Sequence, residues 1–249
     1  MSEKIYLSVV IPAYKESKRI GINLEECEKY FKDKKYSYEI VVVVDGSPDD
    51  TAEVARSYAS RFENFRVIEN KDNHGKGYVV RQGLLEAVGE YRLFFDADGS
   101  TSINHLDAFL PEFEKGYDVV MGSRDIEGAH IQVHQAKWKE LFGDTGNWAI
   151  RITLGLWGYP DTQCGFKMLS AKAAEAVASR MVVDRFGFDF ELVMLAKKLG
   201  FKIKQMPVSW MNEAGSTVSL TGPNGYFQVL WDLFKTRMRL WGGKYKIKK

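Results

Sequence analysis

The chain alternates between short, unbroken apolar runs and longer segments in which apolar residues recur at helical spacing. The apolar runs predict strands at 6–13, 38–45, 65–70, 91–97 and 117–123. Helical spacing is present between them, at 16–33, 49–62, 77–89 and 103–116. Because the apolar runs do not alternate with polar residues, each strand is expected to be covered on both faces. The first half of the chain therefore predicts an α/β fold with a mostly parallel central sheet flanked by crossover helices.

The pattern loosens after residue 123. Residues 134–160 are rich in Trp and predict one or two amphipathic helices, and 162–169 and 201–210 predict strands. Helices are expected at 171–180 and 188–199. A loop of Gly, Ser, Thr and Pro at 215–225 precedes a final helix of aromatic and basic residues.

Composition excludes several classes of protein. The 249 residues are 45% apolar and carry 35 basic and 33 acidic side chains, so no global charge indicates nucleic-acid binding. The two cysteines, Cys27 and Cys164, lie far apart and fit free thiols in a reducing compartment. We see no apolar run long enough for a signal peptide or a membrane-spanning helix, and expect a protein that does not span a membrane.

Acidic residues follow two of the predicted strands. Asp45 ends one strand, and Asp96 and Asp98 end another. In open parallel sheets, ligands bind beyond the carboxyl ends of the strands, so these acids are expected to line a ligand crevice. Asp49 and Asp50 follow closely, but they could equally begin the next helix.

Asp96 and Asp98 are separated by one residue, so their carboxylates point to the same side of an extended strand end. Two carboxylates so close repel each other unless a cation lies beside them. Hard divalent cations such as Mg²⁺ or Mn²⁺ accept one or two carboxylates together with phosphate oxygens and water. The pair therefore suggests a site for a metal and a diphosphate.

The motifs around these acids carry a family resemblance. "VVIPAYKES", "VVVVDGSPDDT", "NHGKGYVVRQG" and "FFDADGS" follow one another in an order that resembles the nucleotide-sugar-binding half of family-2 glycosyltransferases with the GT-A fold. "GSRD", "DTQCGFKMLS", "FGFDFEL" and "VSWMNEAGST" look like the branch of dolichyl-phosphate β-glucosyltransferase and dolichyl-phosphate mannose synthase. The resemblance covers about residues 6–218, and "DTQCGFK" with "GKG" favours the glucosyl branch.

The resemblance implies a domain division and a donor site. It implies a catalytic domain at 1–218, with a nucleotide-binding half at 1–123, an acceptor-side half at 124–218 and a basic amphipathic segment at 219–249. The implied donor-binding residues are Pro12, Tyr14, Glu16, Asp45, Lys76, Asp96 and Asp98. Asp96 and Asp98 would also hold Mg²⁺ or Mn²⁺, with Asp98 favoured as the direct ligand. Tyr14 could instead be a core aromatic residue, and Lys76 a solvated loop lysine.

The acceptor side is implied in the same way. Arg124 matches an arginine that meets a lipid phosphate, a task that suits the guanidinium fork. Asp161, Gln163 and Asp189 match positions that line the sugar and acceptor pocket, although Gln163 could be purely structural. This chain departs from the family pattern at Asp144 and Thr217, where many relatives have a phosphate-binding arginine and a lysine.

The implied reaction is inverting transfer of a hexose, UDP-glucose being the favoured donor, to dolichyl or polyprenyl phosphate. GDP-mannose and UDP-N-acetylglucosamine are alternative donors. The two missing cations keep a hydroxyl acceptor open, and such an acceptor would need a base, for which Asp161 is the candidate. A degenerate member that binds nucleotide or lipid without turnover also stays open. A dinucleotide-dependent reductase is disfavoured because "IPAYKES" replaces the G-x-G-x-x-G fingerprint.

The last residues suggest a location. Trp231, Phe234, Met238 and Trp241 lie among Lys and Arg, and the final fifteen residues contain no acid. This composition is typical of a segment that lies on an anionic membrane surface. We expect a cytoplasmic protein, peripheral on the cytoplasmic face of a membrane; a docked helix with a disordered basic tail is the alternative.

Overall fold

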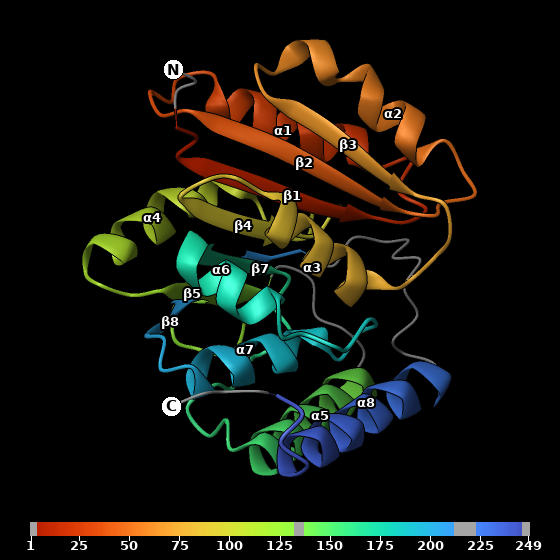
Figure 1. Cartoon of the computed structure of the whole chain (residues 1–249), viewed down its shortest axis with the longest axis vertical. Helices are drawn as coiled ribbons and strands as arrows, with labels where there is room; N and C mark the ends of the chain where they lie inside the picture. Colours follow the sequence, from red (N-terminus) through yellow and green to blue (C-terminus); the bar gives the residue numbers. More distant parts are fainter. Residues whose placement is uncertain (1–3, 132–136, 212–222, 246–249) are drawn as a thin grey trace.

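A seven-stranded sheet forms the centre of the computed structural model (Figure 1). Its backbone is described for residues 4–131, 137–211 and 223–245, and its side chains for the same residues except 131, 137–145 and 223–226. The strand order is β3-β2-β1-β4-β7-β5-β8. The strands are β1 (Leu7–Ala13), β2 (Tyr38–Asp45), β3 (Phe65–Asn70), β4 (Tyr91–Phe95), β5 (Val119–Ser123), β7 (Phe166–Ser170) and β8 (Ile203–Pro207).

The sheet is mostly parallel, as the apolar runs predict. The exception is β7, which pairs antiparallel with β4 on one side and β5 on the other. Strand order reverses at β1, because the chain builds outward to β2 and β3 and then returns to place β4 on the other side of β1. Such a reversal opens a crevice beyond the carboxyl ends of β1 and β4. The acids at the ends of β2 and β4 face this crevice.

Alternate residues of the strands supply two separate cores. Val9 and Ile11 of β1 pack toward one face, with α1 (Ile20–Phe31), α2 (Thr51–Ser57) and α4 (Leu106–Glu114). Val10 packs toward the other face, with α3 (Lys76–Glu86), α6 (Ala171–Ala178) and α7 (Phe188–Lys198). Because successive side chains of a strand point to opposite faces of the sheet, each apolar run packs against both layers of helices.

Four predicted segments differ from the structure for local reasons. The first helix starts at Ile20 rather than 16, because residues 14–19 form a loop at the crevice. The predicted helices 49–62 and 103–116 each include a 3₁₀ turn, at Ala59–Arg61 and at Ile103–His105. The single strand expected at 201–210 is two strands: after Pro207 the chain leaves the main sheet, and β9 (Ser209–Trp210) pairs with β6 (His130–Ile131).

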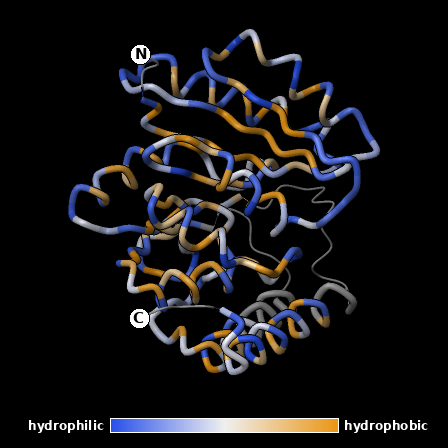
Figure 2. Tube along the Cα trace, viewed as in Figure 1, coloured by the Kyte–Doolittle hydropathy of each residue, from blue (hydrophilic) through white to orange (hydrophobic). Residues whose placement is uncertain are grey.

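Two long helices lie at the end of the molecule opposite β3 (Figure 1). Helix α5 (Lys137–Leu154) and helix α8 (Pro223–Trp241) pack side by side (Figure 1). Leu233 of α8 and Tyr245 after it join the same core cluster as α7, so α8 packs on the body of the molecule. Both apolar and polar residues occur along the described parts of the two helices (Figure 2). In the part of the chain that the structure describes, no helix is both long and apolar enough to cross a bilayer.

Candidate active site

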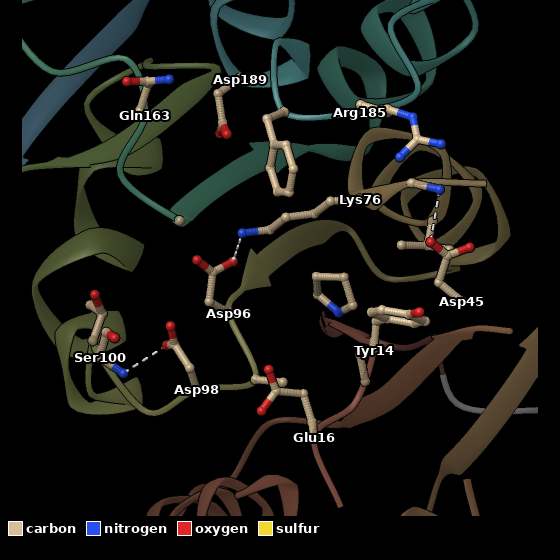
Figure 3. A pocket seen from close by; sticks show the side chains of 18 of the residues that line it. Tyr14, Glu16, Asp45, Lys76, Asp96, Asp98, Ser100, Gln163, Arg185 and Asp189 are labelled. Carbon is tan, nitrogen blue, oxygen red and sulfur yellow. Dashed lines mark hydrogen bonds and ion pairs between the residues drawn. The ribbon is translucent and has the colours of Figure 1, made fainter. Parts of the chain in front are cut away.

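A cavity of about 430 Å³ lies beyond the carboxyl ends of β1, β2 and β4 (Figure 3). Every residue that the sequence predicts for the site lines this cavity, except Asp161. The predicted residues that line it are Pro12, Tyr14, Glu16, Asp45, Lys76, Asp96, Asp98, Arg124, Gln163 and Asp189. The fold thus brings together residues that lie far apart in the chain, from Pro12 in β1 to Asp189 in α7.

Asp96 and Asp98 occupy the turn that follows β4. The backbone N–H of Asp96 donates to the carbonyl of Gly165 at 3.1 Å, and the Asn23 side-chain amide donates to the carbonyl of Asp96 at 2.9 Å. The N–H of Ser100 donates to the Asp98 carboxylate at 3.0 Å. These bonds fix the turn, so both carboxylates are held at the cavity wall (Figure 3).

Gly165 allows the Asp96 carboxylate to lie where it does. A Cβ atom at residue 165 would lie 2.2 Å from Oδ2 and 2.4 Å from Cγ of Asp96. Contacts this short do not occur between real atoms, so a larger residue would displace the carboxylate. Gly165 is not among the residues that the sequence predicts for the site. The Gly in "DTQCGFK" was the signal, but its meaning depends on the antiparallel pairing of β7 with β4.

The residues present fit a hard divalent cation that takes most of its ligands from phosphate oxygens and water. No cluster of three or more His, Cys, Asp or Glu side chains suited to a metal occurs among the described residues. Asp96 and Asp98 supply carboxylates, and Mg²⁺ or Mn²⁺ binds one or two carboxylates together with phosphate oxygens and water. Glu16 is already engaged, since Arg19 donates to both of its carboxylate oxygens at 2.7 Å.

Cations and carboxylates alternate across the cavity floor. Lys76 Nζ lies 2.6 Å from Asp96 Oδ1. Burial opposes the charge on Lys76, but Asp96 and Asp189 outweigh it and raise the pKa of this lysine. Asp189 in turn pairs with Lys167, whose side chain is fully buried. Burial raises the pKa of Asp189 to about 6, although Lys167 and Lys76 act in the opposite direction. Lys76 is therefore a charged cavity residue rather than a solvated loop lysine.

Asp45 holds the loop that leads into α3. Its carboxylate accepts hydrogen bonds from the backbone N–H groups of His74 and Gly75, both at 2.8 Å, and from the Asn73 side chain at 3.0 Å. A carboxylate offers about four lone-pair sites. Three are occupied here, which leaves about one for a ligand. Asp49 lies outside the cavity lining: it accepts from Ser47 and Thr51 and so supports the start of α2.

Asp161 does not reach the cavity, and its predicted role as a base needs correction. Its side chain is fully buried, and it accepts from Arg124 through the backbone N–H at 2.9 Å, Nε at 2.8 Å and Nη2 at 3.0 Å. Burial alone would raise the pKa of Asp161, but the Arg124 cation outweighs it and lowers this pKa. A carboxylate that is buried, paired and held ionised cannot collect a proton from an acceptor in the cavity.

Part of the Arg124 guanidinium is occupied by its pairing with Asp161. Its guanidinium lies 5.6 Å from the centre of the Trp210 ring, and two of its three nitrogens donate to Asp161. Asp161 therefore fixes the orientation of Arg124, whose free side faces the cavity. Trp210 also lines the cavity, because the break after Pro207 brings β9 there.

Arg185 is a cavity residue that the sequence analysis missed. It precedes the "FGFDFEL" segment and lines the cavity. Its carbonyl accepts from the N–H of Phe188 at 3.4 Å, but its guanidinium makes no hydrogen bond or ion pair with the described residues. The turn that carries it passes directly over the start of α3. A Cβ at Gly75, whose φ is +107°, would lie 2.4 Å from the carbonyl oxygen of Asp184. Only the fold shows that this arginine and Lys76 share one wall (Figure 3).

The chain is similar in sequence to a known protein family and to named proteins. Residues 8–177 match the family model described as "Glycosyl transferase family 2". The chain is 34% identical over 257 residues to dolichyl-phosphate β-glucosyltransferase of Dictyostelium discoideum, covering 99% of this chain and 78% of that protein. It is 31% identical over 261 residues to the protein of the same name from Homo sapiens, covering 97% and 78%.

Among solved structures, the fold is similar to that of glucosyl-3-phosphoglycerate synthase from Mycobacterium tuberculosis. Its complex with UDP has a TM-score of 0.67 at 20% identity, covering 94% of this chain and 80% of that one. Its complex with Mn²⁺, UDP-glucose and phosphoglyceric acid has a TM-score of 0.68 at 19% identity, with the same coverage. Identities this low show a shared fold.

Proposed function

This chain belongs to glycosyl transferase family 2, and from that premise we propose that it transfers a hexose from UDP-glucose to dolichyl or polyprenyl phosphate. It has the GT-A fold that the sequence predicts. The observation that carries the proposal is the cavity at the strand reversal, where Asp96, Asp98 and Lys76 face one another. A diphosphate and a divalent cation are the ligands that such a set of charges accommodates.

The donor fits the β1 and β2 side of the cavity. Pro12, Tyr14 and Asp45 would bracket the base and ribose, and Lys76 with Asp98 would face the diphosphate. Asp96 and Asp98 would hold Mg²⁺ or Mn²⁺, which supplies a positive charge to the departing diphosphate. Lys76 is the chain's own contribution to the same task, since its ammonium can neutralise a leaving phosphate oxygen. Glucose is preferred because the curated relatives described above are named β-glucosyltransferases.

A phosphate acceptor suits the chemistry of the other wall. The second pKa of a phosphate monoester is about 6, so near neutral pH its oxygen is already a nucleophile and needs no base. That requirement agrees with Asp161 being unable to act as one. The free side of Arg124 and the guanidinium of Arg185 would bind the acceptor phosphate, which would compensate for the missing cations at Asp144 and Thr217. Gln163 and Asp189 would contact the sugar.

In the proposed reaction, a phosphate oxygen of the acceptor attacks the anomeric carbon on the face opposite the diphosphate. One carbon–oxygen bond forms as the bond to the diphosphate breaks, the nucleoside diphosphate leaves, and the anomeric configuration inverts. The enzyme aligns the two substrates and stabilises the departing charge. A hydroxyl acceptor would need a base. Burial raises the pKa of two carboxyls that line the cavity, Asp189 and Glu16, whereas the pKa of Asp161 is lowered.

The proposal is tested by incubating the purified chain with Mn²⁺ and labelled UDP-glucose, UDP-N-acetylglucosamine or GDP-mannose. Each donor is offered with polyprenyl phosphate, with polyprenol, and with neither. We expect label in the organic extract with UDP-glucose and polyprenyl phosphate, and loss of label when Asp98 is changed to Asn. Asp33→Asn, which removes an exposed carboxylate on the surface, is the matched control and should keep full transfer.

Each other outcome has a meaning. Transfer to polyprenol in preference to polyprenyl phosphate would replace the phosphate acceptor by a hydroxyl acceptor. A higher rate with GDP-mannose would change the donor and leave the acceptor standing. UDP binding in calorimetry without turnover of any donor would favour a degenerate binding protein. We also propose that the chain works at the surface of a membrane, because an isoprenoid tail partitions into a bilayer.

A further inference from the structure

Helix α8 carries a row of exposed apolar side chains along one side. Their positions follow a spacing of four, three, four and three residues, which places them on one face of a helix. They are Phe227, Trp231, Phe234, Met238 and Trp241, here called the α8 apolar stripe. Their exposed fractions run from 47% for Met238 to 69% for Trp241. Most of the exposed large apolar residues in the described chain lie on this stripe or on neighbouring α5 and the turn after it.

The opposite side of α8 is held firmly on the body of the molecule. Leu233 and Thr236 are buried there. Arg239 donates to the carbonyl of Val182 at 3.5 Å, and the hydroxyl of Tyr245 donates to the buried Glu191 at 2.6 Å. The helix is therefore apolar on two sides, of which one is packed and one is not. A docked helix needs only the packed side, so the stripe calls for a second explanation.

The charges around the stripe are all of one sign. Residues 223–245 contain Lys235, Arg237, Arg239 and Lys244, and their single acid, Asp232, is buried against the body. Lys235 lies over the Trp231 ring at 5.3 Å, and Arg237 over the Trp241 ring at 4.5 Å. Aromatic rings mixed with cations suit the boundary between lipid headgroups and acyl chains, because the rings enter the apolar layer while the cations meet lipid phosphates.

Helix α5 continues the same kind of surface. Trp148 and Ile152, four residues apart on its outer side, are exposed, and so is Trp157 in the turn that follows. The rings of Trp148 and Trp157 meet edge to face at 6.3 Å. Since α5 packs beside α8 (Figure 1), the two helices together form one end of the molecule with exposed tryptophans on both.

We propose that the α8 apolar stripe, with Trp148 of α5 and Trp157 of the turn after it, docks this chain onto the surface of an anionic lipid bilayer. The rings insert at the headgroup boundary, and Lys235, Arg237 and Lys244 contact anionic headgroups. A bilayer is favoured over a second protein because the flanking charges have one sign, whereas protein interfaces pair charges of both signs.

This docking would bring the bilayer to the cavity, and that part of the inference rests on the proposed function. The inner side of α8 contacts the segment that lines the cavity: a Cβ at Gly187 would lie 2.7 Å from Cβ of Asp232. Arg185 and Phe186, the two residues before Gly187, line the cavity. A bilayer held against the outer side of α8 is thus separated from the acceptor end of the cavity by one helix. A lipid phosphate could then enter the cavity without leaving the membrane surface.

The test is sedimentation of the whole chain with vesicles, without donor or acceptor. We expect binding to phosphatidylcholine vesicles that contain 30% phosphatidylserine, weaker binding to pure phosphatidylcholine, and weakening by salt. The variant Trp231→Gln/Phe234→Gln/Trp241→Gln should bind at least tenfold more weakly. The matched control is Ile22→Gln/Leu85→Gln/Val88→Gln, which changes three exposed apolar residues elsewhere and should bind like wild type. Circular dichroism confirms that each variant is folded.

Three results would overturn the inference. One is failure of the wild-type chain to bind anionic vesicles, and another is equal binding by the stripe variant. The third is a dimer in lipid-free buffer that the stripe variant abolishes, which would make the stripe a contact between two copies. The outcome is separable from that of the proposed function. Vesicle binding without sugar transfer would contradict the proposed function and leave the docking surface standing. Sugar transfer to detergent-solubilised polyprenyl phosphate without vesicle binding would contradict the docking surface and leave the proposed function standing.

Discussion

Changing Arg124 to Gln should destabilise the fold measurably, because it leaves the Asp161 carboxylate buried without its cation. Asp161 is fully buried and accepts from Arg124 through both the backbone and the side chain. The substitution removes the two side-chain bonds and keeps the backbone bond. A hydrogen bond from Gln163 N–H to Asp161 at 3.1 Å also stays. The perturbation is thus confined to one charge and two hydrogen bonds.

The magnitude follows from the burial of the pair. Removing one partner of a buried ion pair costs about 3–5 kcal/mol, because the other charge stays desolvated. The Arg124 side chain is 27% exposed, which places this pair at the lower end, about 3 kcal/mol. For a chain of this size, each kcal/mol lowers the melting temperature by about 2–4 °C, so a decrease of roughly 6–12 °C is expected. Adding Asp161→Asn to Arg124→Gln removes the unpaired buried carboxylate charge. The double variant should therefore lose less free energy of unfolding than the sum of the two single losses.

Urea unfolding followed by circular dichroism measures the loss, and its pH dependence identifies the cause. Arg124 holds the pKa of Asp161 below its ordinary value of 3.8 in the folded chain. A carboxyl with a lowered folded pKa contributes stability above its unfolded pKa and loses it as pH falls through the folded one. The difference between wild type and Arg124→Gln should therefore be greatest near pH 7 and shrink below about pH 4. A difference under about 1 kcal/mol at pH 7, or one that does not change with pH, would refute the reasoning.

The other predictions concern the cavity floor. Gly165→Ala should lower kcat by tenfold to about a hundredfold with the fold intact, because the new methyl displaces the Asp96 carboxylate; Gly158→Ala, where a Cβ meets nothing within 4 Å, should be silent in the same assay. Lys167→Met removes the buried cation that lowers the pKa of Asp189, so this pKa should rise above about 6. The acid limb of the pH profile of kcat/KM should then move to higher pH. An unchanged acid limb would count against an ionised Asp189 in turnover. Calorimetry of UDP with and without Mn²⁺ should show metal-enhanced binding in wild type and at least a tenfold smaller enhancement in Asp98→Asn; equal enhancement would remove Asp98 from the metal site.

Much of the fold could be predicted because burial on both faces leaves a direct trace in the sequence. A run such as "VVVVD" has no polar residue to place on a solvated face, so it predicts a covered parallel strand that ends where the acid begins. The site could be located for the same reason, since acids at strand ends serve no purpose in a core. The family motifs predicted eleven site residues, and the structure brings ten of them, all but Asp161, to one cavity.

The errors share a different origin. Asp161 was expected in the pocket, and nothing in "DTQCGFK" indicates that Arg124, 37 residues earlier, covers it. Arg185 was missed because a lone arginine before an aromatic turn looks like any surface residue. The strand expected at 201–210 was divided because its last residues join a second sheet. In each case the deciding partner is far away in the chain.

The sequence by itself determined most of the strands, which faces of the helices are apolar, and that carboxylates lie at the ends of β2 and β4, because these depend on the chemistry and spacing of neighbouring residues. Tertiary structure decided which charges are neutralised by a partner and which face the cavity, since pairing and desolvation depend on groups that meet only when the sheet forms. It also decided that α8 has one packed apolar side and one exposed side. The helix pattern records that both sides are apolar, but only the packing of Leu233 and Tyr245 on the body determines which of them is left for another surface.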